Sequence, residues 1–258
     1  MKLSANLGLL WSELPLLDRV YKAKEKNFDA IEFQFPYEVD ANELKKAIDK
    51  INLPIIGINT IKGDVSKGDN GLNAVPSKVR KARSAIDQAI EYAKVIGAKN
   101  IHFMCGITEQ NNNSLKTLVE NLQYAASQLN DSNIGLVIEP KNQNDFPGYF
   151  LTTVEQAKEI CQLVGNNNIK IMFDFYHVQI SQGNVLTRFK DNFNYIGHVQ
   201  MASVPERNEP IFGELNYSNI LSEIHKFGYQ GYVGAEYNPL TNTDDGLSWI
   251  KNINREEK

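Results

Sequence analysis

Short apolar runs alternate along the chain with longer segments in which apolar residues recur every three to four positions. The short runs are rich in β-branched residues, which is typical of buried parallel strands, and the longer segments have the period of amphipathic helices. This pattern predicts eight strands, over residues 3–7, 30–33, 54–58, 100–104, 134–138, 170–173, 195–200 and 232–235. The alternation indicates one strand–helix unit repeated along the chain.

The segments between the strands predict helices at residues 16–26, 42–50, 77–96, 114–129, 153–164, 217–226 and 243–254. Gly97, Gly165 and Gly228 follow three of these segments, and glycine just past the last turn is a common helix stop. The sixth connection, residues 181–190, contains Gly183 and Asn184, so we expect a short or broken helix there.

Eight consecutive units without a linker, a low-complexity stretch or a change of composition predict an α/β fold, a single (β/α)8 TIM barrel spanning residues 1–258. The length of 258 residues is usual for one such barrel. An open doubly wound sheet is the alternative, but it rarely repeats so evenly. The turn at Gly8 lacks the spaced glycines of a dinucleotide-binding motif, so we expect no nicotinamide cofactor.

Composition narrows the possible partners. A net charge of −4 gives no cationic excess for a polyanion, so we expect no nucleic-acid partner. No apolar run is long enough to span a bilayer, and the first residues lack the apolar core of a signal peptide, so we expect no membrane partner and a cytoplasmic protein. Cys105 and Cys161 lie in apolar runs and are expected to be buried thiols.

Four consecutive strands, the fifth to the eighth, end in a polar residue: Glu139, Asp174, Gln200 and Glu236. The carboxyl ends of barrel strands meet at one face, where active sites form. Three carboxylates with no Lys or Arg among them require a counter-charge, and an all-oxygen set favours Mg²⁺ or Mn²⁺ over zinc. Each residue alone could be a helix cap or a surface carboxylate, but four in succession predict a metal site.

A divalent ion in this place could chelate two neighbouring oxygens of an α-hydroxy carbonyl compound and stabilise the enediolate formed by proton loss. We expect Glu139 and Glu236 to be the catalytic pair that removes the proton at one carbon and returns it at the next. His177 is expected to donate to a substrate oxygen and Arg207 to bind a substrate carboxylate, unless they are an idle loop histidine and a surface arginine. His102 also ends a strand and is expected to be a satisfied core histidine.

Several motifs together resemble one family. They are Phe35-Pro36-Tyr37, Leu118-Val119-Glu120-Asn121-Leu122, Ile138-Glu139-Pro140, Pro147-Gly148, Asp174-Phe175-Tyr176-His177, Gly197-His198-Val199-Gln200, Gly213-Glu214-Leu215-Asn216-Tyr217 and Gly234-Ala235-Glu236-Tyr237. With these motifs the chain resembles, over almost its whole length, the hydroxypyruvate isomerase family. That family is one of the xylose isomerase-like barrels, which also include ketose 3-epimerases and 2-oxo-tetronate isomerases.

The resemblance implies a metal-dependent isomerase that interconverts hydroxypyruvate and tartronate semialdehyde or a related short sugar acid. It implies the same roles as above: Glu139 and Glu236 catalytic, these two with Asp174 and Gln200 on the metal, and His177 and Arg207 on the substrate. Related ketose epimerases usually carry histidine at position 200, so glutamine there favours the hydroxypyruvate branch. A small homo-oligomer is a further expectation from the family.

Two segments depart from the family pattern. Residues 58–61 read Ile-Asn-Thr-Ile where the family has His-Asn-Leu-Pro, and residues 141–144 read Lys-Asn-Gln-Asn without a common histidine. Both lie near the expected mouth, where loops set specificity, so they leave the substrate open. One rival is epimerisation of a free ketose. Another is phosphodiester cleavage as in the endonuclease IV group, which uses several zinc-binding histidines, whereas this chain has four histidines with one expected near the site.

Overall fold

Each of the eight predicted apolar runs forms a strand, and all neighbouring strands pair in parallel. The computed structural model describes residues 1–252. Its strands are β1 (Lys2–Asn6), β2 (Ala30–Glu32), β3 (Ile55–Asn59), β4 (Ala98–His102), β5 (Gly135–Ile138), β6 (Ile169–Asp174), β7 (Ile196–Met201) and β8 (Tyr232–Ala235). The last strand pairs with the first, so the sheet is a closed barrel and the predicted fold is confirmed.

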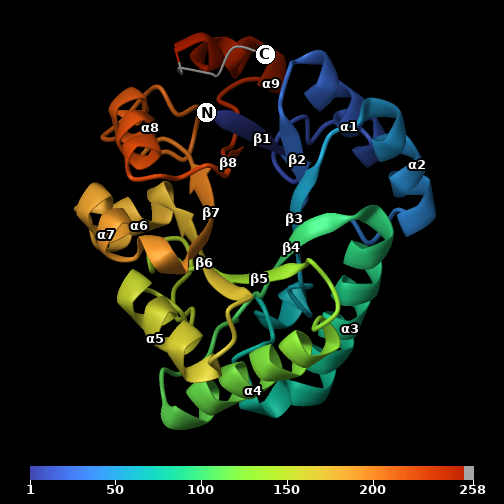
Figure 1. Ribbon diagram of the computed structural model, residues 1–258, viewed down its shortest axis with the longest axis vertical. Helices are drawn as coiled ribbons and strands as arrows, with labels where there is room; N and C mark the ends of the chain where they lie inside the picture. Colours follow the sequence, from blue (N-terminus) through green and yellow to red (C-terminus); the bar gives the residue numbers. More distant parts are fainter. Residues whose placement is uncertain (253–258) are drawn as a thin grey trace.

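The helices lie outside the strands and surround them, as Figure 1 shows. In that view the chain runs around the barrel from blue to red. They are α1 (Leu16–Glu25), α2 (Ala41–Ile51), α3 (Val79–Ile96), α4 (Asn112–Gln128), α5 (Val154–Val164), α6 (Phe175–Ser181), α7 (Val185–Asp191), α8 (Tyr217–Lys226) and α9 (Thr243–Gly246). Within residues 1–252, no helix is both long and apolar enough to cross a membrane.

The predicted helix stops are confirmed. Gly97 and Gly165 cap α3 and α5 with the left-handed backbone that glycine adopts without steric cost. The sixth connection is broken as expected, because α6 ends before Gly183 and Asn184, both with positive φ, and α7 begins after them. The last predicted helix, 243–254, begins as α9 and continues as a 3-10 helix to Asn252; its final two residues and the end of the predicted 1–258 domain lie outside the described residues.

The core fills the space inside the barrel and between the strands and the helices. Leu3, Ile31, Ile101 and Leu136 are fully buried strand residues, and the helices present their apolar faces to the strands. Both cysteines are buried free thiols, as predicted. Because this core fixes the strands, it also fixes the level at which each strand ends, and therefore the positions of the polar residues that follow.

Candidate metal centre and active site

The four predicted ligands lie on neighbouring strands at nearly one level. Glu139 follows β5 directly, Asp174 is the last residue of β6, Gln200 lies in β7 and Glu236 follows β8. In the sheet register Asp174 pairs with Gln200, and Gln200 pairs with Gly234. All four side chains are buried. Parallel register therefore gathers them at the carboxyl end of the barrel, the face where the sequence placed the site.

Glu139, Asp174 and His177 form the tightest group, with ligand atoms that all lie within 4.8 Å of one another. Asp174 has two roles. Its Oδ1 accepts a hydrogen bond from the Tyr176 backbone amide, which caps α6, so the cap alternative holds for this oxygen. Its Oδ2 has no hydrogen-bond partner among the described residues and faces the group.

Three buried oxygens in the mouth have no hydrogen-bond partner among residues 1–252: Glu139 Oε1, Asp174 Oδ2 and Gln200 Oε1. A buried polar atom left without a partner costs about 1–3 kcal/mol, so such a cluster requires an explanation. Hard oxygen atoms of this kind are the ligands that Mg²⁺ and Mn²⁺ prefer. The donor set therefore fits a divalent ion of the kind the sequence predicted.

A group of buried residues below the mouth, called here the inner group, consists of Asn6, Glu32 and His198. The Glu32 carboxylate accepts hydrogen bonds from the Asn6 amide and from Gln200 Nε2, and it lies 2.9 Å from His198 Nε2. Burial opposes its ionisation, but His198, Gln200 and Asn6 outweigh burial and lower the pKa of Glu32. Since Gln200 donates downward to Glu32, its free Oε1 is left for the mouth.

Glu32 was not among the residues predicted from the sequence, although a signal was present. It ends the second strand in the same way as the predicted ligands end theirs, with an apolar run followed by a carboxylate. Strand periodicity alone could not show that its partners come from β1 and β7, which lie 26 and 166 or more residues away in the sequence.

His177 presents a donor to the mouth. Its Nδ1 receives the Asn142 side-chain amide at 2.7 Å and the Asn142 backbone amide at 3.4 Å. Asp145 fixes the orientation of that side-chain amide by accepting from Asn142 Nδ2 and donating its backbone N–H to Asn142 Oδ1. Burial is the main cause that holds the pKa of His177 well below its ordinary value, and the charges of Arg207 and Lys141 lower this pKa further. A neutral ring whose Nδ1 accepts carries its hydrogen on Nε2, which faces Glu139 and Asp174 at 3.6 and 3.8 Å.

Two cations lie among the carboxylates. Arg207 Nη2 is 2.8 Å from Glu236 Oε2 and 3.9 Å from Asp174 Oδ2, and Lys141 Nζ is 3.1 Å from Glu139 Oε2. The expectation of carboxylates without Lys or Arg among them was therefore wrong. Strand ends were identified correctly, but these cations come from the loops that follow them. Charge balance alone thus does not require a metal; the unpartnered oxygens are the observation that supports one.

Arg207 is held rigidly for a loop residue. Its backbone is left-handed with φ 56°, a conformation that costs about 1 kcal/mol for a residue other than glycine. Backbone hydrogen bonds to Ser203 and from Asn238 maintain it, and the guanidinium stacks over the Tyr176 ring at 5.1 Å. Its Nε is buried and has no partner among the described residues, so this side chain retains a free donor for an anion.

The two acids beside Arg207 have raised pKa values. Burial raises the pKa of Asp174 well above its ordinary value, Arg207 opposes this, and Glu236 and Glu139 add to it. Burial likewise raises the pKa of Glu236, with Arg207 opposing and Glu139 adding. Carboxyl groups with raised pKa values hold a proton more readily than free carboxyl groups do.

The histidine expectations need two corrections. His102 is buried, but its Nε2 has no hydrogen-bond partner among the described residues and lies 3.5 Å from Glu139 Oε2, so it is not a satisfied core histidine. Three of the four histidines, His102, His177 and His198, lie in or just below the mouth, not one as expected. His177 was predicted there, but His102 and His198 were missed because their side chains converge on it only after the barrel closes.

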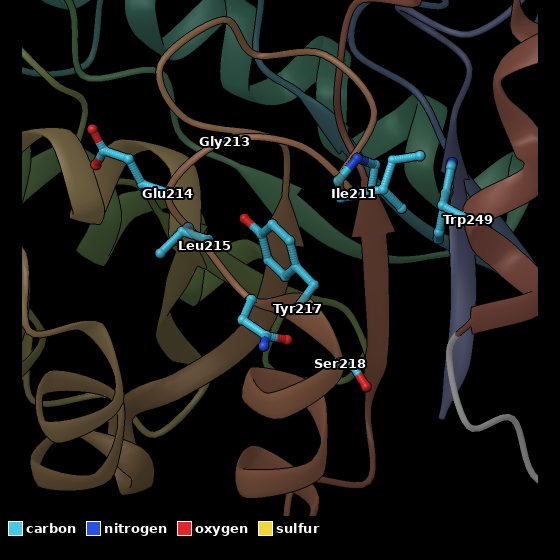
Figure 2. A pocket seen from close by; sticks show the side chains of 9 residues that line it. Ile211, Gly213, Glu214, Leu215, Tyr217, Ser218 and Trp249 are labelled. Carbon is cyan, nitrogen blue, oxygen red and sulfur yellow. The ribbon is translucent and has the colours of Figure 1, made fainter.

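A second hollow lies outside the mouth, with a cavity volume of about 430 Å³. Figure 2 shows Ile211 and Trp249 beside Tyr217 and the segment that leads into α8. Its lining holds one carboxylate, Glu214, and none of the predicted site residues. This hollow therefore lacks the clustered carboxylates that mark the barrel mouth.

Comparisons with known proteins agree with this geometry. A family model described as xylose isomerase-like TIM barrel matches residues 20–253. The chain is 40% identical over 253 residues to a 2-oxo-tetronate isomerase of Cupriavidus necator, with 97% of each chain covered. It is 39% identical over 256 residues to a hydroxypyruvate isomerase of Escherichia coli, covering 97% of this chain and 98% of the other.

A solved structure described as an AP endonuclease of family 2 from Brucella melitensis superposes with a TM-score of 0.94 at 35% identity. The superposition covers 97% of this chain and 98% of that one. The similarity in sequence and in structure therefore extends over the whole barrel and is not confined to the motifs at the mouth.

Proposed function

The chain belongs to the xylose isomerase-like TIM barrel family and is an isomerase, and from that premise we propose that it interconverts hydroxypyruvate and tartronate semialdehyde, or a closely related short sugar acid. The named relatives at 36–40% identity are 2-oxo-tetronate isomerases and hydroxypyruvate isomerases, which supports a sugar acid as the substrate class. The proposed substrate is a small molecule.

Glu139 and Glu236 are the proposed proton carriers. One carboxylate removes the proton from C3 of hydroxypyruvate, which gives an enediolate, and a proton is then returned to C2, while the hydroxyl proton passes from O3 to O2. The raised pKa of Glu236, caused first by burial, makes this carboxylate a better proton acceptor than a free glutamate. Glu139 has two oxygens for its two proposed roles: Oε1, without a hydrogen-bond partner among the described residues, for the ion, and Oε2, now 3.1 Å from Lys141 Nζ, for the proton.

His177 and Arg207 are the proposed substrate-binding residues. His177 Nε2–H is a neutral donor that can hydrogen-bond an enediolate oxygen without releasing its proton. Arg207 holds a free Nε donor beside Glu236, and a guanidinium can bind both oxygens of a carboxylate. A carboxylate held there would keep the adjacent carbons between the two glutamates.

Glu139, Asp174, Gln200 and Glu236 are the proposed ligands of a divalent ion, Mg²⁺ or Mn²⁺. When bound, such an ion supplies Lewis-acid stabilisation of negative charge on the substrate oxygens. The first three residues each offer an unpartnered buried oxygen. Glu236 accepts from Asn6, Gln34 and Arg207, so its participation requires Arg207 to turn toward the substrate.

The observation that carries the proposal is the cluster of unpartnered oxygens between two glutamates in an isomerase barrel. It also bears on the rivals. An endonuclease-type zinc cluster needs several free histidines, but Glu32 engages His198, and Asn142 leaves His177 as a donor. A ketose 3-epimerase would use the same glutamates, yet it has no use for Arg207 as a carboxylate clamp.

Proton exchange in heavy water tests the proposal directly. The parent protein, with Mg²⁺ or Mn²⁺, should exchange the carbon-bound protons of hydroxypyruvate or 2-oxo-tetronate faster than those of fructose or tagatose. Glu139→Gln and Glu236→Gln should each lower exchange by about a thousandfold, since general acid–base catalysis supplies roughly 10²–10⁴ in rate. Nuclear magnetic resonance of the substrate measures the exchange.

Glu206→Gln is the matched control, because this exposed carboxylate adjoins Arg207 in sequence and has no role in the site. It should exchange at the parent rate. A Glu139 or Glu236 variant that also keeps the parent rate would remove that residue from the mechanism. A parent that exchanges free ketoses and no sugar acid would replace the proposal with an epimerase.

A further inference from the structure

Three cationic side chains surround the mouth. Two have roles given above: Arg207 as the proposed carboxylate-binding residue and Lys141 as the partner of Glu139. The third has no role so far. Lys62, Lys141 and Arg207 follow β3, β5 and β7, three alternate strands of the closed barrel. Their charges act on one another: burial lowers the pKa of Lys62, Lys141 and Arg207 lower it too, and Glu236 raises it. Because each follows a strand of the closed barrel, all three lie on the face where the strands end.

Lys141 is a buried lysine with a fixed position. It is 7% exposed, and its Nζ lies 4.7 Å from the Phe146 ring centroid and 5.8 Å from that of Tyr149. Its one carboxylate contact among the described residues is Glu139 Oε2, at 3.1 Å. Lysine is rarely buried without a reason, since desolvating its charge is unfavourable. The aromatic rings restrict its rotamers, so its charge is presented to the mouth without much loss of entropy.

Lys62 is half-buried and has no carboxylate within 4.0 Å among residues 1–252. Its Nζ lies 5.1 Å from the centroid of the Phe35 ring, a cation–π contact that restricts the side chain. A like charge at Lys141 makes this position unfavourable in the absence of an anion. An anion between the two lysines would remove the repulsion.

The charges of the mouth also favour an additional anion there. Glu139, Asp174 and Glu236 balance the three cations as they stand. If a divalent ion occupies the carboxylates, as proposed above, the mouth carries an excess of positive charge, and a substrate with one carboxylate neutralises only part of it. A second anionic group on the substrate would neutralise the rest.

We propose that Lys62 and Lys141 form a second anion subsite, which binds an anionic group at the end of the substrate distant from Arg207. In the closed barrel β3 lies opposite β7, so Lys62 and Arg207 face each other across the mouth. The substrate class is then a short sugar acid that carries a terminal phosphate or a second carboxylate. This inference rests on the proposed function for the position of the first carboxylate.

Three unreactive four-carbon acids test the subsite by isothermal titration calorimetry: erythronate with one carboxylate, tartrate with two, and 4-phosphoerythronate with a carboxylate and a phosphate. None has a carbonyl to isomerise. The parent should bind at least one of the two dianionic acids about tenfold or more tightly than erythronate, equivalent to one well-placed ion pair. The more tightly bound of the two identifies the second group as carboxylate or phosphate.

Lys62→Gln should reduce this preference to about twofold and leave erythronate affinity unchanged, because it removes only the distant charge. Lys67→Gln is the control, since Lys67 lies in the same loop, is exposed and pairs with Asp64. Equal affinity of the parent for all three acids would overturn the subsite, and so would a Lys62→Gln variant that weakens all three alike. The proposed function is judged separately by hydroxypyruvate exchange: a parent that exchanges but shows no preference refutes the subsite alone, and one that shows the preference without exchange refutes the isomerisation alone.

Discussion

The inner group and the mouth contain carboxylates that are equally buried but differ in whether both of their oxygens have partners. Glu32 is 2% exposed and both of its oxygens have partners, whereas Glu139 and Asp174, at 2% and 1%, each keep one oxygen without a hydrogen-bond partner among the described residues. Burial and residue type therefore do not separate a structural acid from a functional one. A cluster of carboxylate oxygens without hydrogen-bond partners does, because a bound ion or ligand can complete it.

The largest expected effect comes from disrupting the inner group, where both oxygens of the buried carboxylate have partners. Glu32→Leu should destabilise the fold by about 3 kcal/mol, because the buried amides of Asn6 and Gln200 and the His198 ring would lose their partner. Asp174→Asn should cost less than about 1 kcal/mol, because asparagine caps a helix as well as aspartate. Urea denaturation of the metal-free proteins measures both. Equal losses in the two variants would contradict the distinction between the inner group and the mouth.

Binding of a divalent ion should stabilise the mouth, where carboxylate oxygens lack hydrogen-bond partners. Mn²⁺ at about 100 times its dissociation constant should raise the free energy of unfolding by about 2.7 kcal/mol. Asp174→Asn should lose most of this gain, since it removes one of the unpartnered oxygens and a charge. Thermal unfolding with and without Mn²⁺ is the measurement, and Glu206→Gln, which should keep the full gain, is the control. A gain that survives in Asp174→Asn would place the ion elsewhere.

A smaller effect is expected at the guanidinium. Arg207→Lys should weaken binding of erythronate about tenfold, because an ammonium replaces a planar group that can bind both carboxylate oxygens. Calorimetry with erythronate gives the affinity. Unchanged affinity would show that the free Nε donor of Arg207 does not serve a carboxylate.

The smallest expected effect concerns the His177 tautomer. Asn142→Ala should lower turnover of hydroxypyruvate about fivefold, corresponding to one hydrogen bond of about 1 kcal/mol. Without the Asn142 amide, Nδ1 can carry the ring hydrogen instead of Nε2. Nitrogen chemical shifts of the imidazole should report this change of tautomer, and an unaltered tautomer would exclude Asn142 as the positioning residue.

Much of the fold could be predicted from the sequence, because the local period of apolar residues indicates each strand and helix of the barrel. All eight strands and the glycine helix stops were found, with strand ends displaced by up to two residues. The strand-end residues Glu139, Asp174, Gln200 and Glu236 followed from the same reasoning, since a parallel register carries successive strand ends to one level.

The partners of these residues could not be predicted. Asn6 and Glu236, for example, form a hydrogen bond across 230 residues of sequence, and Lys141 pairs with Glu139 while its Nζ lies over the rings of Phe146 and Tyr149. Periodicity gives the face on which a side chain lies, but its rotamer and its long-range partners depend on the closed barrel. Glu32, His102 and the lysines of the mouth were missed for that reason, whereas Arg207 was predicted as a substrate-binding residue.

Anomalous diffraction from a crystal grown with Mn²⁺ tests the central claim most directly. The account predicts one strong manganese peak in the barrel mouth, with oxygens of Glu139, Asp174, Gln200 and Glu236 at about 2.0–2.4 Å. It also predicts that Arg207 leaves the Glu236 oxygen it now binds. A mouth without a peak, with Arg207 still paired to Glu236, would contradict the account.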